Sequence, residues 1–490
     1  MVKLNLNNGD VTVLNIANQL PCEFLQPWHQ VDIVKILAKM PDFYPVFLNN
    51  HGQNLIAFLP KTSFVVYFSE QPNLFNVTIN DVTTNQKNKT YVLNFEQINQ
   101  LLVDFCEQNQ SVVKYHTVVK NHNADLNYYQ NGLIGFVSYD FSAHALADLA
   151  KHSLDYNKPC AFFAHYPYFL QKLNHNWYLI SYTTELTDLV AIRQQLTEIF
   201  EQNLVVKTHV YKPLTLSASW QYADYQRAFD KVQRYLYAGD CYQINLTQQW
   251  QAKLKNQTLA DCLTPLQLPM QTDFSGYLKV KGMEVLSCSP ELFFTFVKKN
   301  HQIELITKPI KGTRPRHADA NIDEKLKHEL SLSEKDIAEN VMIVDLLRND
   351  LGKYAKTGSV AVPKLFDIES FSNVHHMVST VTATLKPKIH PMTALLQSLP
   401  AGSITGTPKK RAVEIIHELE SDNRGAYCGT LGYLNFDGSG QWNVLIRTLQ
   451  AYNDRVELWA GGGVTIASDC RAEYQECFDK VGNLLKFLAK

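Results

Sequence analysis

Short runs of apolar and aromatic residues recur through the N-terminal half of the chain, and turn-forming residues such as His51-Gly52 separate them. Runs of this length between turn residues predict antiparallel strands joined by hairpins. The runs are Val46–Leu48, Leu55–Leu59, Phe64–Phe68, Phe75–Ile79, Tyr91–Phe95, Gly132–Tyr139 and Trp177–Tyr182.

Helical periodicity interrupts these strands. Apolar residues between Ile98 and Cys106 fall on one helical face, and a second helix is predicted around Leu186–Phe200. Strands followed by helices, without a regular strand–helix–strand alternation, predict an α+β fold. The segment Asn203–Ser219 is the best candidate for a linker, so we expect an N-terminal region over 1–204 and a second region over 220–490.

Composition narrows the function classes. Hydrophobic residues make up 45% of the 490 residues, charged residues 19%, and the formal net charge is -1, which argues against nucleic acid as a partner. No apolar run approaches the ~20 residues that span a bilayer, and Met1–Gln19 does not read as a signal peptide. Nine scattered cysteines without a CxxC pair predict reduced thiols and a cytoplasmic protein.

Candidate chemistry begins in Thr307–Arg316, which holds four cations in ten residues. Ile303, Leu305 and Thr307 predict a strand that Pro309 ends, so Lys311 would lie just beyond it among like charges. Such a lysine could hold a dianion, or it could lose its proton and act as a nucleophile. The alternative is a basic surface turn.

Carboxylates supply two further candidates. Glu291 borders the apolar run Leu292–Phe296, where it would be partly protonated and suited to general acid catalysis, unless it is a solvated strand-end residue. Two predicted helices each carry a pair of acids three residues apart, and together the pairs could hold Mg²⁺ through oxygen ligands. The alternative is two solvated helix faces, with Asp336 capping its helix. The pairs are Asp336 and Glu339, in the helix Glu334–Leu347, and Glu473 and Glu476, in a helix that Ser468 could cap.

Anion-binding positions complete the set. In the predicted strand Asn443–Gln450, Arg447 lies on the same face as Leu445 and Leu449, so its guanidinium is at an edge, paired internally or bound to an anion. Three consecutive glycines, Gly461–Gly463, end another strand and would let backbone N–H groups approach a ligand carboxylate. Cys241 nearly fits the Gly-x-Cys-x-Gly elbow of a glutaminase, but Gln243 replaces the second glycine, so we interpret Cys241 as a packed thiol.

From about Trp220 to its end, the chain resembles the chorismate-utilising enzymes, which include anthranilate, aminodeoxychorismate and isochorismate synthases. The fold implied is two twisted antiparallel sheets packed face to face, with helices outside and strands from both halves. The motifs that carry the resemblance are Pro309–Thr313, Asp345–Gly352, Pro400–Arg411, Gly461–Gly463 and Ala472–Lys480.

The resemblance implies a role for each candidate. Glu339 and Glu476 would ligate Mg²⁺, which holds the ring carboxylate of chorismate, while Asp336 and Glu473 would support the metal through water. Arg447, Tyr427 and the amides of Gly461, Gly462 and Gly463 would hold the enolpyruvyl carboxylate. His376 could assist departure of the ring hydroxyl, whereas His375 is interpreted as a neutral packed histidine. The other positions that match substrate contacts are Gly312, Thr313 and Ser403.

Two positions discriminate among the family's members. In water-adding relatives a lysine base resembles the residue at Gln243, and glutamine cannot deprotonate water, so ammonia is the expected incoming group. Lys311 is similar to the lysine of aminodeoxychorismate synthase component I, where anthranilate synthases usually have alanine. The implied mechanism is a covalent Lys311 adduct, with Glu291 helping the C4 hydroxyl to leave. A separate glutaminase subunit would supply ammonia, and the alternatives are anthranilate synthase component I and a catalytically silent paralogue.

Overall fold

Two antiparallel sheets of 12 strands each form the centre of the molecule. The computed structural model describes residues 18–50, 53–82, 86–110, 128–150, 154–173, 175–183, 186–203, 211–371 and 374–490. The predicted turn at His51-Gly52 and residues 204–210 of the predicted linker lie outside these ranges.

The first sheet combines strands from both halves of the chain. Its strands, in spatial order, are β1 (Asn18–Pro21), β10 (Asn176–Ser181), β9 (Tyr168–Leu173), β3 (Gln53–Ala57), β2 (Val46–Asn50), β13 (Gly276–Val280), β14 (Met283–Ser287), β23 (Thr448–Tyr452), β24 (Arg455–Val464), β12 (Gln243–Lys253) and β11 (Ser217–Ala218), with β20 (Gly406–Thr407) also paired to β12.

The second sheet is built in the same way. Its strands, in spatial order, are β17 (Ile310–Pro315), β19 (Val374–Thr384), β16 (Gln302–Thr307), β15 (Leu292–Lys299), β22 (Gly440–Asn443), β21 (Thr430–Asn435), β7 (Gly132–Val137), β8 (Ala161–His165), β4 (Thr62–Phe68), β5 (Phe75–Asp81) and β6 (Gln86–Leu93), with β18 (Ala361–Ser370) also paired to β19.

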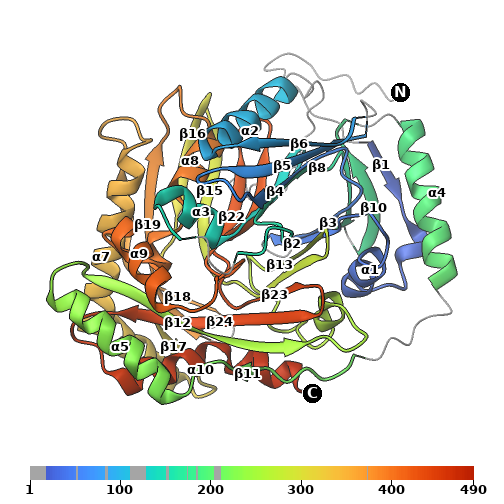
Figure 1. Cartoon of the computed structure of the whole chain (residues 1–490). Helices are drawn as coiled ribbons and strands as arrows, with labels where there is room; N and C mark the ends of the chain where they lie inside the picture. Colours follow the sequence, from blue (N-terminus) through green and yellow to red (C-terminus); the bar gives the residue numbers. More distant parts are fainter. Residues whose placement is uncertain are drawn as a thin grey trace, which may run out of the picture.

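A layer of apolar side chains joins the two sheets. One buried cluster includes Leu48 and Leu278 of the first sheet together with Val65, Ile134 and Leu431 of the second. Alternate residues of a strand point to opposite faces, so each sheet contributes one face to this layer and turns the other toward the helices. The predicted α+β fold of two packed antiparallel sheets is therefore confirmed (Figure 1).

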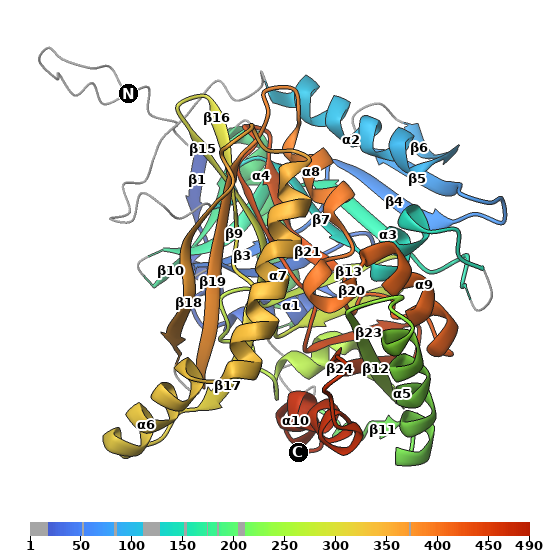
Figure 2. The ribbon, with the colours of Figure 1, turned by 90° about the vertical axis from the view of Figure 1, so that its left-hand side faces the viewer.

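Helices cover the outer faces (Figure 2). Helix α7 runs beside β18 and β19 of the second sheet. Helix α10 packs on β24 of the first sheet. The helices are α1 (Gln30–Leu37), α2 (Phe95–Gln110), α3 (Tyr139–Leu146), α4 (Leu186–Asn203), α5 (Tyr222–Tyr237), α6 (Ala320–Ser331), α7 (Glu334–Gly352), α8 (Pro391–Ser398), α9 (Lys409–Leu419) and α10 (Cys470–Leu488). Within the described ranges, none is long and apolar enough to cross a membrane.

Both sheets are shared between the two predicted regions. In the first sheet β2 pairs with β13, and in the second β7 pairs with β21. The division of the chain into 1–204 and 220–490 stays a prediction. Hydrogen-bonded strand pairs cross this boundary in both sheets.

Two local expectations are corrected by the structure. Asp469, rather than Ser468, caps α10 by accepting a hydrogen bond from the Ala472 N–H, while the Ser468 hydroxyl donates to Glu473. The segment around Lys311 is the strand β17, paired with β19, rather than a turn. Pro309 separates it from β16, because proline has no N–H for the ladder.

Candidate active site

A cavity of about 620 Å³ opens between β17 and α7 on one side and β24 and α10 on the other. Of the candidate site residues named from the sequence, all but Gly462 line it. Those that line it are Glu291, Lys311, Gly312, Thr313, Asp336, Glu339, His376, Ser403, Tyr427, Arg447, Gly461, Gly463, Glu473 and Glu476.

Lys311 enters the cavity at a bulge in β17. The pairing with β19 shifts between Lys311 and Thr313, and the intervening Gly312 has a φ of +77°, which favours glycine. The Lys311 side chain is 14% exposed, and its Nζ lies 3.9 Å from Oε2 of Glu339. The amine therefore faces the cavity, next to a carboxylate.

Carboxylates accompany the positive charges of this segment. Every cation of this segment has a carboxylate within 4.0 Å, and these acids come from elements on both sides of the strand. The pairs are Lys308 with Glu369, Lys311 with Glu339, Arg314 with Asp336 and Arg316 with Asp323.

Glu291 lies on the segment between β14 and β15 and is only 7% exposed. Burial raises the pKa of Glu291 to about 7, although the neighbouring Lys311 ammonium and a hydrogen bond from the Ser403 hydroxyl, at 3.4 Å, oppose the rise. A carboxyl group with this pKa is substantially protonated near neutral pH, as a general acid must be.

His376 faces the cavity from β19. One of its ring nitrogens, Nδ1, lies 2.9 Å from the Thr313 hydroxyl, and burial lowers the pKa of His376 to about 4, with help from Arg447. The imidazole is therefore neutral at physiological pH. His375 points away from the cavity and bonds to Ser370 and Asp323, in agreement with a packed role.

Arg447 and Tyr427 form the anion-facing wall. Arg447 precedes β23 in a left-handed conformation with a φ of +51°, so the predicted strand alternation at this residue is wrong. Among the described residues its guanidinium has no carboxylate within ion-pair distance, which leaves it available to a ligand anion. Tyr427 stacks on Trp459, with ring centroids 6.4 Å apart.

The glycine segment belongs to β24 rather than to a turn. Gly461, Gly462 and Gly463 pair with Thr247, Leu246 and Asn245 of β12. On the other side of β24, β23 pairs only as far as Leu458. In the described chain, no strand therefore continues the sheet along the second edge of the glycines, and their backbone can approach a ligand there.

Carboxylates from α7 and α10 face each other across the cavity. Burial raises the pKa of Glu339 and of Glu473, and the Glu476 carboxylate adds to the rise in both. Burial opposes ionisation of Glu476 too, but Lys480, whose Nζ lies 2.7 Å from it, holds the pKa of Glu476 below its usual value.

The oxygen donors of this set are of the kind that suits a hard cation. Oε2 of Glu473 is buried without a hydrogen-bond partner in the described residues, and a buried carboxylate oxygen in that state is ready for a cation. Gly462 makes room for the acids, since a Cβ there would lie 2.8 Å from Glu473 Oε2 and 3.0 Å from Glu476 Oε1. Lys335 and Lys480 now compensate these acids, and no three His, Cys, Asp or Glu side chains of the described residues already converge as metal ligands.

Sequence reasoning missed several residues of the cavity wall. Lys480 follows Glu476 by four positions, a spacing that indicates an ion pair on one helix face, so this contact was predictable. Lys335 precedes Glu339 by four positions and was predictable in the same way. Asn245 and Trp459 carry no such local signal, because distant segments bring them to the cavity. Cys241 is buried, and burial raises its pKa to about 11, as suits a packed thiol.

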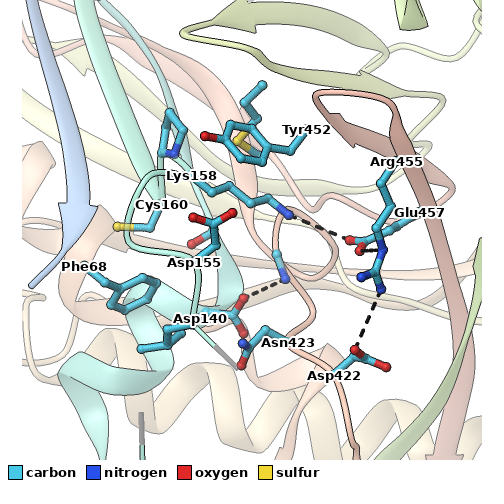
Figure 3. Close-up of a pocket in the computed structure, with 15 residues that line it drawn as sticks. Phe68, Asp140, Asp155, Lys158, Cys160, Asp422, Asn423, Tyr452, Arg455 and Glu457 are labelled. Carbon is cyan, nitrogen blue, oxygen red and sulfur yellow. Dashed lines mark hydrogen bonds and ion pairs between the residues drawn. The ribbon is translucent and has the colours of Figure 1, made fainter. Parts of the chain in front are cut away.

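A second, smaller cavity of about 160 Å³ is shown in Figure 3. Its charged groups largely pair with one another: Glu457 accepts from Arg455 at 2.8 Å and lies 3.7 Å from the Lys158 ammonium. Asp140 accepts a hydrogen bond from the Gly425 N–H at 2.7 Å, and burial raises its pKa to about 6. This cavity is smaller, and none of the candidate site residues named from the sequence line it, so it is a poorer candidate for the chemistry than the larger one.

Comparisons with known proteins agree with this geometry. Residues 74–486 match the chorismate binding enzyme family. Aminodeoxychorismate synthase component 1 of Escherichia coli is 38% identical over 390 residues, which cover 78% of this chain and 82% of that protein. Anthranilate synthase component 1 of Bacillus subtilis is 36% identical over 301 residues, covering 61% and 57%.

The fold has a matching solved structure. Anthranilate synthase component I of Streptococcus pneumoniae superposes with a TM-score of 0.69 at 24% identity, covering 91% of this chain and 93% of that one. The match to the family covers most of the sequence, including every residue that lines the large cavity. The chain is therefore an enzyme of the chorismate binding family.

Proposed function

We propose that this enzyme aminates chorismate at C4 to form 4-amino-4-deoxychorismate, as an aminodeoxychorismate synthase component 1. The observation that carries the proposal is the placement of the Lys311 amine inside the cavity, close enough to the buried Glu291 for its charge to affect that carboxyl. The 38% identity to the E. coli enzyme of that name supports the same assignment.

The proposed reaction uses Lys311 as a covalent catalyst. The uncharged Lys311 amine adds to ring C2, both ring double bonds shift along the ring, and the C4 hydroxyl leaves as water with a proton from Glu291. Ammonia then adds at C4, both double bonds shift back, and the lysine leaves from C2. The enolpyruvyl ether remains intact. Two inversions place the amine where the hydroxyl had been.

The other cavity residues bind and orient the substrate. Arg447, Tyr427 and the glycine edge of β24 would hold the enolpyruvyl carboxylate. The contacts proposed for Gly312, Thr313, His376 and Ser403 keep C2 in front of Lys311. Glu339 and Glu476 would hold Mg²⁺ directly, with Asp336 and Glu473 behind them, and the ion would supply positive charge for the ring carboxylate.

Ammonia is the proposed nucleophile. Gln243 is fully buried beneath Gly463, and its amide cannot act as a base toward water. The name "component 1" of the E. coli relative implies a synthase of several components, and we propose that a glutaminase subunit supplies the ammonia through a transient complex. The nine cysteines are free thiols, which supports the reducing compartment expected from the sequence.

The competing function is that of anthranilate synthase component 1, which the B. subtilis relative favours. It would expel pyruvate and give a fluorescent aromatic amine. A catalytically silent paralogue is the third possibility, and the common placement of Lys311, Glu291, Glu339 and Glu476 in one cavity argues against it.

The test is incubation of wild type and Lys311→Ala with chorismate, ammonium and Mg²⁺, followed by mass spectrometry of product and protein. We expect 4-amino-4-deoxychorismate from the wild type and loss of most activity in Lys311→Ala, because the amine proposed to add to C2 is then missing. Lys308→Ala is the matched control, since Lys308 lies in the same segment but pairs with Glu369 outside the cavity wall. Normal turnover by Lys311→Ala would exclude the covalent role, and anthranilate as product would exclude the proposed function.

A further inference from the structure

A buried ion pair lies behind the wall of the large cavity. Arg424 is 1% exposed and follows α9, four residues after Glu420. Its Nε and Nη2 each donate to the Glu420 carboxylate at 2.7 Å, which is the bidentate arrangement of a strong pair. Glu420 also accepts a hydrogen bond from the Thr247 hydroxyl of β12 at 2.6 Å.

The remaining donors of Arg424 reach two cavity-lining segments. Its Nη2 donates to the carbonyl oxygen of Asn245 at 2.7 Å, and its Nη1 donates to that of Ile404 at 3.2 Å. Both Asn245 and Ile404 line the large cavity, and the Asn245 amide itself donates to the Ile404 carbonyl at 2.9 Å. One guanidinium therefore joins β12 to the loop that carries Ser403.

The same guanidinium supports a third part of the wall. It lies between two aromatic rings, 4.8 Å from the ring centroid of Tyr139 and 5.8 Å from that of Tyr427, which also lines the cavity. These contacts add cation–π attraction to the packing of a buried guanidinium. Arg424 thus contacts three wall segments that are separate in sequence, at Asn245, Ile404 and Tyr427.

The N-terminal half holds this arrangement from behind. The Tyr139 N–H donates to the Gly425 carbonyl at 2.9 Å, and the Asp140 carboxylate accepts from the Gly425 N–H at 2.7 Å (Figure 3). Both residues belong to α3. The loop that leads from Arg424 to Tyr427 is therefore fixed by both halves of the chain.

Stability alone is a weak reason for such a pair. Two charges lose hydration when they are buried, and buried ion pairs can often be replaced by apolar residues of similar volume without loss of stability. Here, however, the donors of Arg424 end on backbone groups of the cavity wall, where displacement of about 1 Å can lower a rate by ~10²-fold.

We propose that Arg424, held by Glu420, is the positioning residue of the active site and sets the distances among Asn245, Ile404 and Tyr427. The inference rests on the proposed function only in taking the large cavity as the chorismate site. Arg424 touches no substrate and acts through the wall segments that it joins.

Two variants test the proposal. Arg424→Lys keeps the charge but has too few donors in a plane to reach Glu420, Asn245 and Ile404 together. The double variant Arg424→Met/Glu420→Leu replaces the pair with apolar side chains of similar volume. Arg411→Lys is the matched control, because Arg411 forms its ion pairs with Asp240 and Glu414 at the surface, where it is 39% exposed.

For each purified full-length variant, the melting temperature, kcat and KM for chorismate are measured with ammonium and Mg²⁺. We expect Arg424→Lys to melt within about 5 °C of wild type, while its kcat/KM falls between about tenfold and a hundredfold, with a rise in KM. The double variant is expected to fold and to lose as much activity, whereas Arg411→Lys keeps the wild-type constants.

A folded variant of Arg424 with wild-type kcat/KM would overturn the proposal. Failure of both variants to fold would overturn it as well, because the pair would then serve the fold rather than the site. The inference is tested by the ratio of kcat/KM in the variant to kcat/KM in the wild type, whichever product forms. The identity of the wild-type product separately decides whether the proposed amination at C4 holds.

Discussion

Two glutamates of one cavity show how surroundings, rather than residue type, assign chemical roles. Glu291 is buried, and burial raises its pKa to about 7. Glu476 lies beside Lys480, which holds its pKa below the usual value, so it stays ionised and suited to a cation. When the pKa values of two carboxyl groups are shifted in opposite directions in this way, one group can act as a general acid while the other stays ionised.

The pKa of Glu291 leads to a prediction about pH. The raised pKa means that the carboxyl is protonated below pH 7 and loses its proton above it, so a reaction that needs its proton should slow as pH rises. We expect kcat/KM to fall with an apparent pKa of about 7, approaching tenfold per pH unit.

Glu291→Gln removes this proton, so it should lower activity by about 10²–10⁴-fold and abolish the alkaline limb. The matched control is Glu304→Gln, because Glu304 of β16 pairs with Lys299 of β15 and does not line the cavity. Steady-state rates across pH 5.5–9 in each variant provide the measurement, and an unchanged alkaline limb in Glu291→Gln would remove Glu291 from the acid role.

Residue-scale expectations from sequence succeeded where the deciding neighbours are local. The apolar run after Glu291 predicted a carboxyl with a raised pKa, and burial raises that pKa to about 7. The acids that pair with the cations around Lys311 could not be predicted, since Glu339, the partner of Lys311, comes from α7, and Glu369 of β18 pairs with Lys308. Charges adjacent in sequence say little when a strand sends alternate side chains to opposite faces.

At the scale of elements, α7 and α10 meet across the end of β24. Each helix supplies carboxylates at three-residue spacing, and Gly462 of β24 leaves the space in which Glu473 and Glu476 approach each other. The predicted pairing of acids on each helix was possible from sequence, because the spacing is local. Their meeting across the cavity depends on the sheet beneath, which periodicity does not reveal.

The glycine provides an element-scale prediction. A Cβ in Gly462→Ala would displace the Glu473 and Glu476 carboxylates, which are the movable ends of side chains, so the fold should tolerate it. We expect the Mg²⁺ concentration for half-maximal activity to rise about tenfold or more, consistent with the effect of disturbing the groups that orient metal ligands. Calorimetric titration with Mg²⁺ gives a second readout that is independent of turnover.

Gly482→Ala is the control for this variant, because Gly482 lies in the same helix, α10, with open space around it. It should leave Mg²⁺ binding unchanged. Removal of divalent metal with a chelator should stop turnover in the wild type and in both variants, and added Mg²⁺ should restore it. Equal Mg²⁺ affinity in Gly462→Ala and wild type would show that these carboxylates do not hold the ion.

At the scale of the whole molecule, the strand runs and the α+β class were predictable because alternation and turns are local signals. The order of strands was not, since β2 joins β13 and β7 joins β21 across more than two hundred residues of sequence. Only the resemblance to a family implied that both halves would share the sheets. The contact of α3 with Gly425 was likewise invisible, although it fixes the loop before Tyr427.

This sharing predicts that residues 220–490 do not fold alone. Without the N-terminal half, β13 and β21 would lose the partners β2 and β7, and each would become an exposed edge inside what is now a continuous sheet. Most of the buried apolar cluster between the sheets, including Leu48, Val65 and Ile134, would also be missing. We expect the fragment to aggregate, and co-expression with residues 1–219 to restore a soluble, active complex.

Near-UV circular dichroism and thermal unfolding would check this, with the full chain unfolding in one transition as the reference. A monomeric fragment that unfolds cooperatively would mean that the C-terminal half closes its own core, and the loop before Tyr427 would then need support other than α3.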